Sequence, residues 1–488
     1  MSGLGQWLVK ISYGLFPAAY VYAEAAYGLT RSVELLIFLW ALGGIVSMWF
    51  VGHVLQGRLP RIGRWPWILS AAILILGWTV TAVSYVDAGI TEGTLPDSWD
   101  GLIPDAMLIH WNSWDAKLSA QAMLRTMVLL GGMLMAIDFW RDEKRGRVLL
   151  VTIVLTAFGM VLFFLEQKLI APDQALTSED GSVHLSFATY RYHGNGASYL
   201  NLCWPFAAAI ALFAILRQTP AWPLWLLPLA ATFIATFINI SKAGNVLSAV
   251  GIFLFLALCI PFLTKGIKRS RRKLRRSHLI VAALPLLIVL LSIPFALPWK
   301  RWNNLVDKQD STASRSQAYV QFAQMAKDAG VGGFGPGTFA KFSGLYTGKD
   351  LVLRQLHYLN AHEDYLQTVI EWGYAGAFLW GLLLVPPLFF LLKGTFRRSK
   401  RSPREFEGYR IGLWDHLKPF FGGAPLPWEP CVAAAGATAM ILTALHSAVD
   451  FPMQIASLQF HFLTVIALGW SYRLIQPEDE ASEDVSLS

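Results

Sequence analysis

The residues of this chain best suited to chemistry lie in residues 356–376, which read LHYLNAHEDYLQTVIEWGYAG. This stretch carries two histidines, His357 and His362, and the second is followed by the acidic pair Glu363 and Asp364. A histidine beside carboxylates can take or give a proton near neutral pH, which is the chemistry of a general acid or base. Because the stretch leads directly into an apolar run, the alternative is that these residues only cap a helix at a wet interface.

Cationic and histidine residues also stand at the ends of other apolar runs. Arg191 and His193 come directly before one run, Lys242 lies in a short turn between two runs, and His446 and Asp450 close another. Ionisable groups at such positions are often only interface anchors. Arginine, however, suits phosphate oxygens, because its fork donates two parallel hydrogen bonds and never deprotonates. Gathered on one face of a membrane, these segments predict a site for a lipid-linked phosphate or diphosphate, with a histidine as the base.

Metal and serine-hydrolase chemistry compete with this interpretation, but their motifs are missing. His357 and His362 are five residues apart, whereas the HExxH helix of a zinc enzyme presents its histidines four apart on one face. The segments expected outside the membrane contain no Asp-x-Asp pair, and the sequence has no G-x-S-x-G elbow. We therefore expect no catalytic metal and no cofactor.

The elements that must position these residues are membrane helices. Of the 488 residues, 55% are hydrophobic and 15% are charged, against roughly 25% charged in a soluble domain. Apolar runs long enough to cross a bilayer recur from one end of the chain to the other. The predicted fold is all-α, a polytopic membrane bundle of about twelve spans. The predicted spans are residues 8–28, 33–55, 66–86, 120–139, 148–167, 197–215, 222–239, 245–264, 278–298, 374–393, 430–449 and 455–473.

Basic residues concentrate in four connections between these spans, at residues 56–65, 140–147, 265–277 and 394–404. An even number of predicted spans separates each connection from the next. The positive-inside rule therefore places all four, together with both termini, in the cytoplasm. The long segment 299–373 then forms an outer loop. Because the cations cluster beside spans, the formal charge of +8 does not indicate a nucleic-acid partner.

The long loop is predicted to contain its own short structure. Residues 313–328 contain Arg315, and after it apolar side chains recur at helical spacing. This pattern predicts an amphipathic helix over 313–328 that lies on the membrane or on the bundle. The following run, residues 330–339, reads GVGGFGPGTF and must turn tightly. Such turns either only connect elements or expose successive N–H groups as a nest for an anion.

Three regions are expected along the chain. The first, residues 1–185, contains the N-terminal spans. The second, residues 186–476, contains the remaining spans and the long outer loop. The third, residues 477–488, is an acidic, serine-rich cytoplasmic tail that we expect to be disordered.

Several of these pieces share their order and spacing with a known family. They are the segment from Arg191 to Asn195, the Ser-Lys-Ala-Gly turn at 241–244, the helix opened by Arg315, the GFGPGTF turn, the AHEDYLQTVIEWGYAG stretch and the HSAVDFP segment at 446–452. Over roughly residues 185–470 the chain resembles the O-antigen ligase and polysaccharide polymerase superfamily of bacterial inner membranes. Two positions depart from the family pattern. Lys242 stands where arginine is usual, and Glu363 follows the loop histidine where asparagine is frequent.

The resemblance implies roles for individual residues. In the family, outer-face arginines hold the pyrophosphate of an undecaprenyl-linked glycan, and the loop histidine activates the acceptor hydroxyl. The implied catalytic base is therefore His362. The implied diphosphate ligands are Arg191, Arg315 and Lys242. The residues expected to support them are His193, Glu363, Asp364, His446 and Asp450. The implied enzyme is a metal-independent, inverting glycosyltransferase.

The resemblance also implies partners and a location. The donor is an undecaprenyl-diphosphate-linked oligosaccharide, and the protein is a multi-pass protein of the bacterial cytoplasmic membrane with its site facing the periplasm. The acceptor stays open between another lipid-linked glycan, lipid A core and a protein hydroxyl, although the HSAVDFP segment favours a polymerase. The alternative class is a lipid-linked oligosaccharide flippase or another transporter, which about twelve spans would also fit.

Overall fold

The computed structural model describes most of the chain in nine stretches separated by gaps. The described residues are 2–86, 113–170, 187–217, 219, 222–239, 241–269, 309–347, 358–396 and 424–474. The predicted span 278–298, His357 and the predicted tail 477–488 lie outside them.

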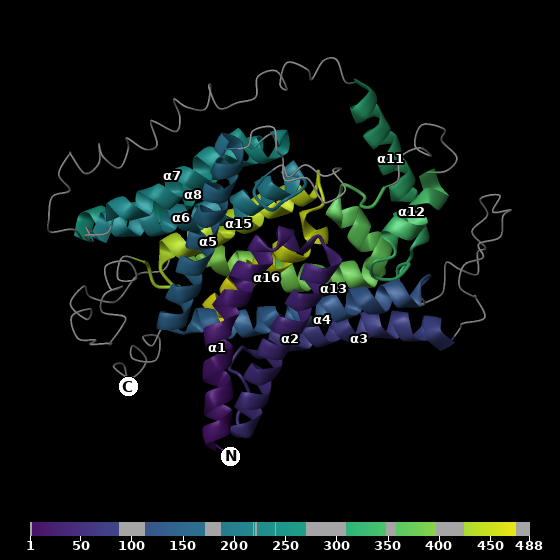
Figure 1. The fold of residues 1–488 in the computed structure, drawn as a ribbon, viewed down its shortest axis with the longest axis horizontal. Coiled ribbons are helices and arrows are strands. Elements are labelled where there is room, and N and C mark those ends of the chain that lie inside the picture. Colours follow the sequence, from purple (N-terminus) through teal and green to yellow (C-terminus); the bar gives the residue numbers. More distant parts are fainter. Residues whose placement is uncertain are drawn as a thin grey trace, which may run out of the picture.

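The described residues form helices and no strand, as Figure 1 shows, so the all-α prediction is confirmed for this part of the chain. The long helices are α1 (Ser2–Ala25), α2 (Ser32–Leu55), α3 (Arg64–Val86), α4 (Ala116–Arg141), α5 (Glu143–Ile170), α6 (His193–Arg217), α7 (Trp222–Ile238), α8 (Lys242–Arg269), α11 (Gln309–Asp328), α13 (Asp364–Gly394), α15 (Pro430–Ser447) and α16 (Ala456–Leu474). The short ones are α12 (Phe339–Thr347) and the 3-10 turns η1 (Tyr27–Leu29) and η6 (Pro452–Gln454).

Eight of the described helices are long and apolar enough to cross a membrane, so the chain is a multi-pass membrane protein. They are α2, α3, α4, α5, α6, α8, α13 and α15. Three other predicted spans are helices that do not reach this standard. Helix α7 has 17 residues, and α1 and α16 are long enough but less apolar.

Helix α16 is long enough to cross a membrane but less apolar than the eight candidate spans, and its position explains why. It lies inside the bundle against α4, α13 and α15, and its residues from Ala456 to Tyr472 are almost all buried. A helix surrounded by protein can carry polar side chains where they find protein partners. Tyr20 and His461 share a hydrogen bond of 2.9 Å there, for example.

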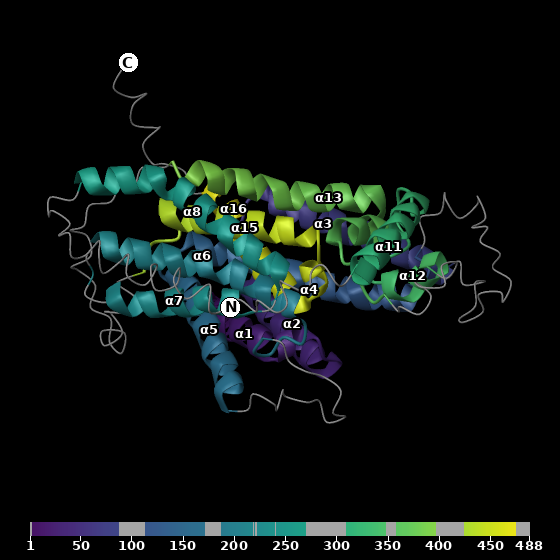
Figure 2. The same cartoon turned by 90° about the horizontal axis from the view of Figure 1, so that it is seen from above.

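Most of the long helices share one direction. Figures 1 and 2 show α3, α4, α6, α7, α8, α13, α15 and α16 running roughly side by side, whereas α1, α2 and α5 cross them steeply. Helices α11 and α12 cover one end of this bundle in both views, and we call it the cap end.

The cap packs through its own aromatic core. The predicted amphipathic helix is confirmed as α11, which buries Phe322 and Met325 against α12 and α13. The Trp114 ring lies 4.0 Å from that of Phe334, which joins this core to the segment before α4. The glycine-rich turn and the start of α13 therefore belong to one packed unit.

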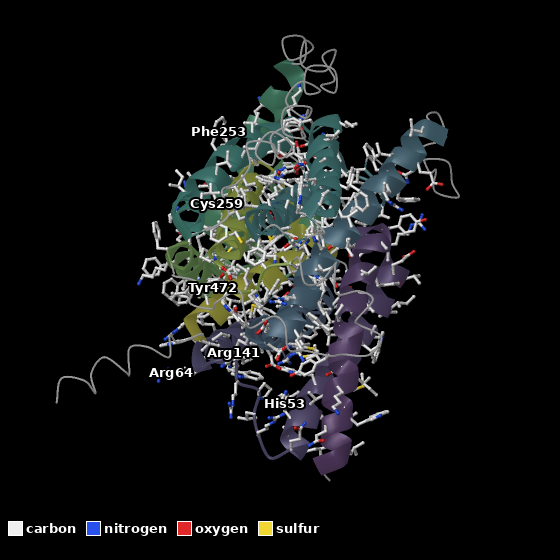
Figure 3. All side chains as sticks on the ribbon, turned by 90° about the vertical axis from the view of Figure 1, so that its left-hand side faces the viewer. His53, Arg64, Arg141, Phe253, Cys259 and Tyr472 are labelled. Carbon is white, nitrogen blue, oxygen red and sulfur yellow. The ribbon has the colours of Figure 1, made fainter. Side chains whose placement is uncertain are left out.

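The opposite end of the bundle is held by a buried carboxylate. Asp138 on α4 accepts hydrogen bonds from Tyr13 on α1 and from Trp49 on α2, the latter at 3.0 Å. Arg145 on α5 lies 3.4 Å away and His53 lies 3.7 Å away. Figure 3, which views the molecule from this end, labels His53 and Arg141 in this region. Four helices thus meet at one charge, and the crossing helices α1, α2 and α5 are fixed to α4.

Candidate active site

His362 lies at the cap end, immediately before α13. The helix begins at Asp364, and Glu363 is its N-cap, whose carboxylate accepts two backbone N–H bonds of the first turn. Helix α13 therefore starts two residues after His362, because the carboxylate of Glu363 takes the capping position. His362 instead has a left-handed backbone with φ of 54°, and its carbonyl accepts a 2.9 Å bond from the Tyr319 hydroxyl. Such a conformation is strained for a residue other than glycine and has to be held by its surroundings.

Asp450 lies between two histidines. Its Oδ1 is 3.6 Å from Nδ1 of His362, and its Oδ2 is 3.7 Å from Nε2 of His446. The second histidine is bonded further, because its Nδ1 lies 2.7 Å from Oγ of Ser198 on α6. Residues from three distant parts of the chain therefore form one line of polar groups, from Ser198 through His446 and Asp450 to His362.

Exposure decreases along this line toward the bundle interior. The side chain of His362 is 26% exposed, that of Asp450 is 8% exposed and that of His446 is 1% exposed. Both carboxylate–imidazole distances exceed that of a normal hydrogen bond, and such contacts often tighten only when substrate is bound. Within this line, His362 is the group most open to an incoming molecule.

The charge of Asp450 is fixed by its neighbours. Burial opposes its ionisation, but the contacts with His362 and His446 outweigh burial and hold the pKa of the carboxyl well below its usual range. A depressed pKa means that the ionised group stabilises the folded state at any pH above the unfolded value, about 3.9, and that this contribution is lost only at lower pH. Asp450 is thus a carboxylate throughout the range in which histidine titrates.

The two acidic residues after His362 have structural contacts of their own. Burial raises the pKa of Glu363, although the two backbone N–H groups it caps act in the opposite direction. Asp364 is buried, and it accepts bonds of 2.9 Å from the Met453 backbone and 3.0 Å from the Gln454 side chain. Asp364 therefore fixes the start of α13 to the turn that follows Asp450.

Two aromatic rings, those of Phe451 and Tyr192, lie next to His362. Its ring meets the Phe451 ring edge-on at 4.7 Å, and Phe451 stacks on Tyr192 at 5.2 Å. The Tyr192 ring in turn lies 4.5 Å from that of His193, the first residue of α6. Gly194 is required here, because a Cβ at this position would collide with Asp450 and Tyr192. The structure thereby brings the predicted segments 191–195 and 446–452 against His362.

Lys242 is placed near the same segment through its helix. Asn201 on α6 donates a 3.3 Å bond to the carbonyl of Gly244 in the first turn of α8, so the starts of α6 and α8 lie next to each other. Asn239, three residues before Lys242, donates a 3.1 Å bond to the carbonyl of His193. Arg191 precedes α6 by two residues. Arg315 falls on α11, but its side chain lies outside the described part of the structure.

The glycine-rich turn does not present its N–H groups as a nest for an external anion. Phe334 and Gly335 donate to the carbonyls of Ile370 and Glu371, at 2.9 and 3.0 Å. The N–H of Gly337 donates at 2.9 Å to the carboxylate of Glu371. The turn thus binds the start of α13, and the side chain that accepts the N–H bond of Gly337 is the protein's own Glu371.

The contact between the glycine-rich turn and α13 also requires a glycine within α13, at Gly373. Gly373 has φ of 64° in the middle of the helix, and a Cβ there would collide with the backbone of Val331 and Gly333. The kink lets Tyr374 and Ala375 donate to the carbonyls of the glycine-rich turn, at 3.1 and 3.2 Å.

Two members of the site were not singled out by sequence patterns. Ser198 lies one helical turn beyond Gly194, but no spacing connects it to His446, 248 positions away. Phe451 belongs to the HSAVDFP segment, but the sequence gives it no role of its own. Its ring lies between those of His362 and Tyr192 because the η6 turn follows it. Among the described residues, no group of three or more histidine, cysteine, aspartate and glutamate side chains is arranged to hold a metal ion.

Fold and site together define a multi-pass helical membrane protein with an acid–histidine site at the capped end of its bundle. The O-antigen ligase family model matches residues 227–381, which contain α8, α11, α12, His362 and the first half of α13. This match confirms, over these residues, the resemblance predicted from the sequence. No curated protein matched the chain.

Proposed function

We propose that this chain is a membrane glycosyltransferase that moves a glycan from an undecaprenyl-diphosphate carrier to a sugar hydroxyl outside the cytoplasmic membrane. The observation that carries this proposal is the position of His362 within the segment matched by the O-antigen ligase family, next to Asp450 and to the segment of Arg191. A base beside cations, at one end of a membrane bundle, suits an acceptor hydroxyl and a diphosphate leaving group.

The geometry supports a definite base atom. A ring nitrogen that faces a carboxylate carries a proton, so His362 holds its proton on Nδ1, toward Asp450. Its Nε2 is then the atom with a free electron pair. By the same argument His446 carries its proton on Nε2, and its Nδ1 accepts from the Ser198 hydroxyl.

Transfer then proceeds in one displacement. Nε2 of His362 takes the proton of the acceptor hydroxyl while the acceptor oxygen forms a bond to the anomeric carbon. The bond from that carbon to the carrier diphosphate breaks on the opposite face, so the anomer is inverted. The positive imidazole that results is stabilised by Asp450.

Cations and helix ends receive the leaving diphosphate. Arg191, Arg315 and Lys242 are the proposed ligands, and His193 is a further polar group beside them. Helices α6 and α8 begin next to each other at this point, and helix N-termini favour anions. The protein supplies positioning and charge here, and we propose that no metal is required.

The direct test is transfer by the purified protein. It is incubated with lipid-linked oligosaccharide, alone or with lipid A core or a hydroxyl-bearing peptide, without nucleotide sugar and with or without a chelator. We expect glycan growth or transfer, together with release of the carrier diphosphate, and no effect of the chelator. Movement of the lipid-linked donor across a vesicle bilayer without any transfer would instead support a flippase.

The orientation of the bundle can be tested with one matched pair. Val320 on α11 and Leu59, between α2 and α3, are each 67% exposed, and all three native cysteines are buried. In spheroplasts, a membrane-impermeant maleimide should label Val320→Cys at once and Leu59→Cys only after permeabilisation. The opposite pattern would place the cap in the cytoplasm and overturn the proposed site.

A second matched pair tests the role of His446. His446→Gln keeps an N–H group that can reach Asp450, whereas His446→Asn keeps polar atoms only near Ser198. If the His446–Asp450 contact tightens into a hydrogen bond when substrate binds, losing that bond to a charge costs about 1.5–3 kcal/mol, so His446→Asn should lower kcat roughly 10- to 100-fold. His446→Gln should retain most of kcat, and donor KM should change little in both. Equal losses with lowered thermal stability would show that His446 only fills space.

A further inference from the structure

An apolar groove runs along the outside of the bundle between α1 and α5. Its volume is about 590 Å³, and it is lined by Val21, Ala25, Tyr27, Leu155, Thr156, Gly159, Met160, Phe163 and Thr189. Val21, Leu155 and Phe163 are each more than a third exposed, so the groove opens toward the surroundings of the bundle. From Leu155 to Phe163 it follows α5 over nine residues, about 12 Å of helix.

One end of the groove lies close in sequence to the proposed site. Thr189, which lines this end, donates a 2.8 Å bond to the carbonyl of Glu24 at the end of α1. Tyr192, whose ring stacks on Phe451, is three residues further along the chain. Three residues reach at most about 10 Å, so the groove ends within the length of a short polar head group from the aromatic rings beside His362.

Charge complements this arrangement. The guanidinium of Arg31 lies 3.8 Å from the centre of the Tyr27 ring and 3.8 Å from the carboxylate of Glu34, and Arg191 follows Thr189 by two residues. The groove is therefore apolar along its length, and Arg191 is the cation that follows its site-facing end along the chain. A molecule with a long hydrocarbon chain and an anionic head matches both parts.

We propose that this groove binds the isoprenoid chain of the lipid-linked donor, so that the chain lies between α1 and α5 while its diphosphate reaches Arg191. The inference rests on the proposed function, since it assigns the donor's tail to a surface. The two helices that line the groove, α1 and α5, are among those that cross the bundle steeply.

Gly159 gives a direct test of the groove. A Cβ built at Gly159 meets no atom within 4 Å, so Gly159→Leu should fill the groove without displacing its walls. Gly44 on α2 is the matched control, because it is exposed and equally free of neighbours. Leucine is also the better helix former at both positions, so neither change should weaken its helix.

The measurement compares two donors with the same glycan and diphosphate, one with a full-length isoprenoid chain and one with a single isoprene unit. Gly159→Leu should raise KM for the long-chain donor roughly 10- to 30-fold, because several carbons of the isoprenoid chain can no longer be buried in the groove. KM for the short-chain donor should not change. Gly44→Leu should match the wild type with both donors. Equal losses with both donors would mean that the site itself is distorted, and no change with either would mean that the groove holds only bulk lipid; each result overturns the proposal.

A binding readout separates this inference from the proposed function. A donor analogue with a photoreactive group on its isoprenoid chain is cross-linked to the protein, and the labelled peptides are mapped. Label on α1 and α5 that is lost in Gly159→Leu and kept in Gly44→Leu supports the groove even if no transfer is detected. Label elsewhere, with transfer intact, overturns the groove and leaves the proposed function standing.

Discussion

Replacing His362 by alanine is expected to reduce glycan transfer below detection while the protein remains folded and still binds lipid-linked donor. General-base assistance is typically worth about 10²- to 10⁴-fold in rate. The structure strengthens the reason for choosing this residue, because its ring is oriented by Asp450 and lies against the rings of Phe451 and Tyr192. The measurement is single-turnover transfer with saturating donor, accompanied by donor binding and a thermal melt in detergent.

His357 is the control for this experiment. It is five residues upstream of His362, and we expect His357→Ala to lose much less activity. Small and equal losses from the two substitutions would mean that these histidines only hydrate an interface. The base would then have to be sought at His193 or His446.

Replacing Arg191 by alanine is expected to lower transfer roughly 30- to 1000-fold, because a charge-assisted, bidentate contact with a diphosphate contributes on the order of 2–4 kcal/mol. Arg191→Lys should recover only part of the loss, since lysine lacks the planar fork. The rate of a single turnover should fall together with donor affinity, because the leaving group gains charge as its bond breaks. Arg315→Ala is expected to act in the same direction.

Two further variants make this prediction specific. Arg58 is exposed at the end of the bundle away from the cap, and Arg58→Ala should transfer at the wild-type rate. Lys242→Arg restores the residue usual in the family and should keep or increase activity. Wild-type transfer by Arg191→Ala, with normal expression, would show that this arginine does not hold the phosphate.

The sequence by itself determined the helices and the residues at their ends. Apolar runs must satisfy their backbone groups internally in a bilayer, so each run that the structure describes lies in a helix. Two of these helices, α1 and α13, begin six and ten residues earlier than the predicted spans 8–28 and 374–393. The amphipathic spacing after Arg315 likewise predicted α11, because a helix buries one stripe of side chains whatever it packs against. The sequence also placed His362, Arg191 and Asp450 in polar segments beside these runs.

Only the tertiary structure decided how those residues act on one another. Asp450 follows His446 by four residues, which is a local spacing, but its contact with His362 exists only because α13 and α15 meet at η6. The glycine-rich turn could have held an external anion, but α13 supplies Glu371 to its N–H groups instead. Contacts between distant segments depend on how complete helices pack, and a local pattern of residues carries no information about the partner that will arrive from elsewhere in the chain.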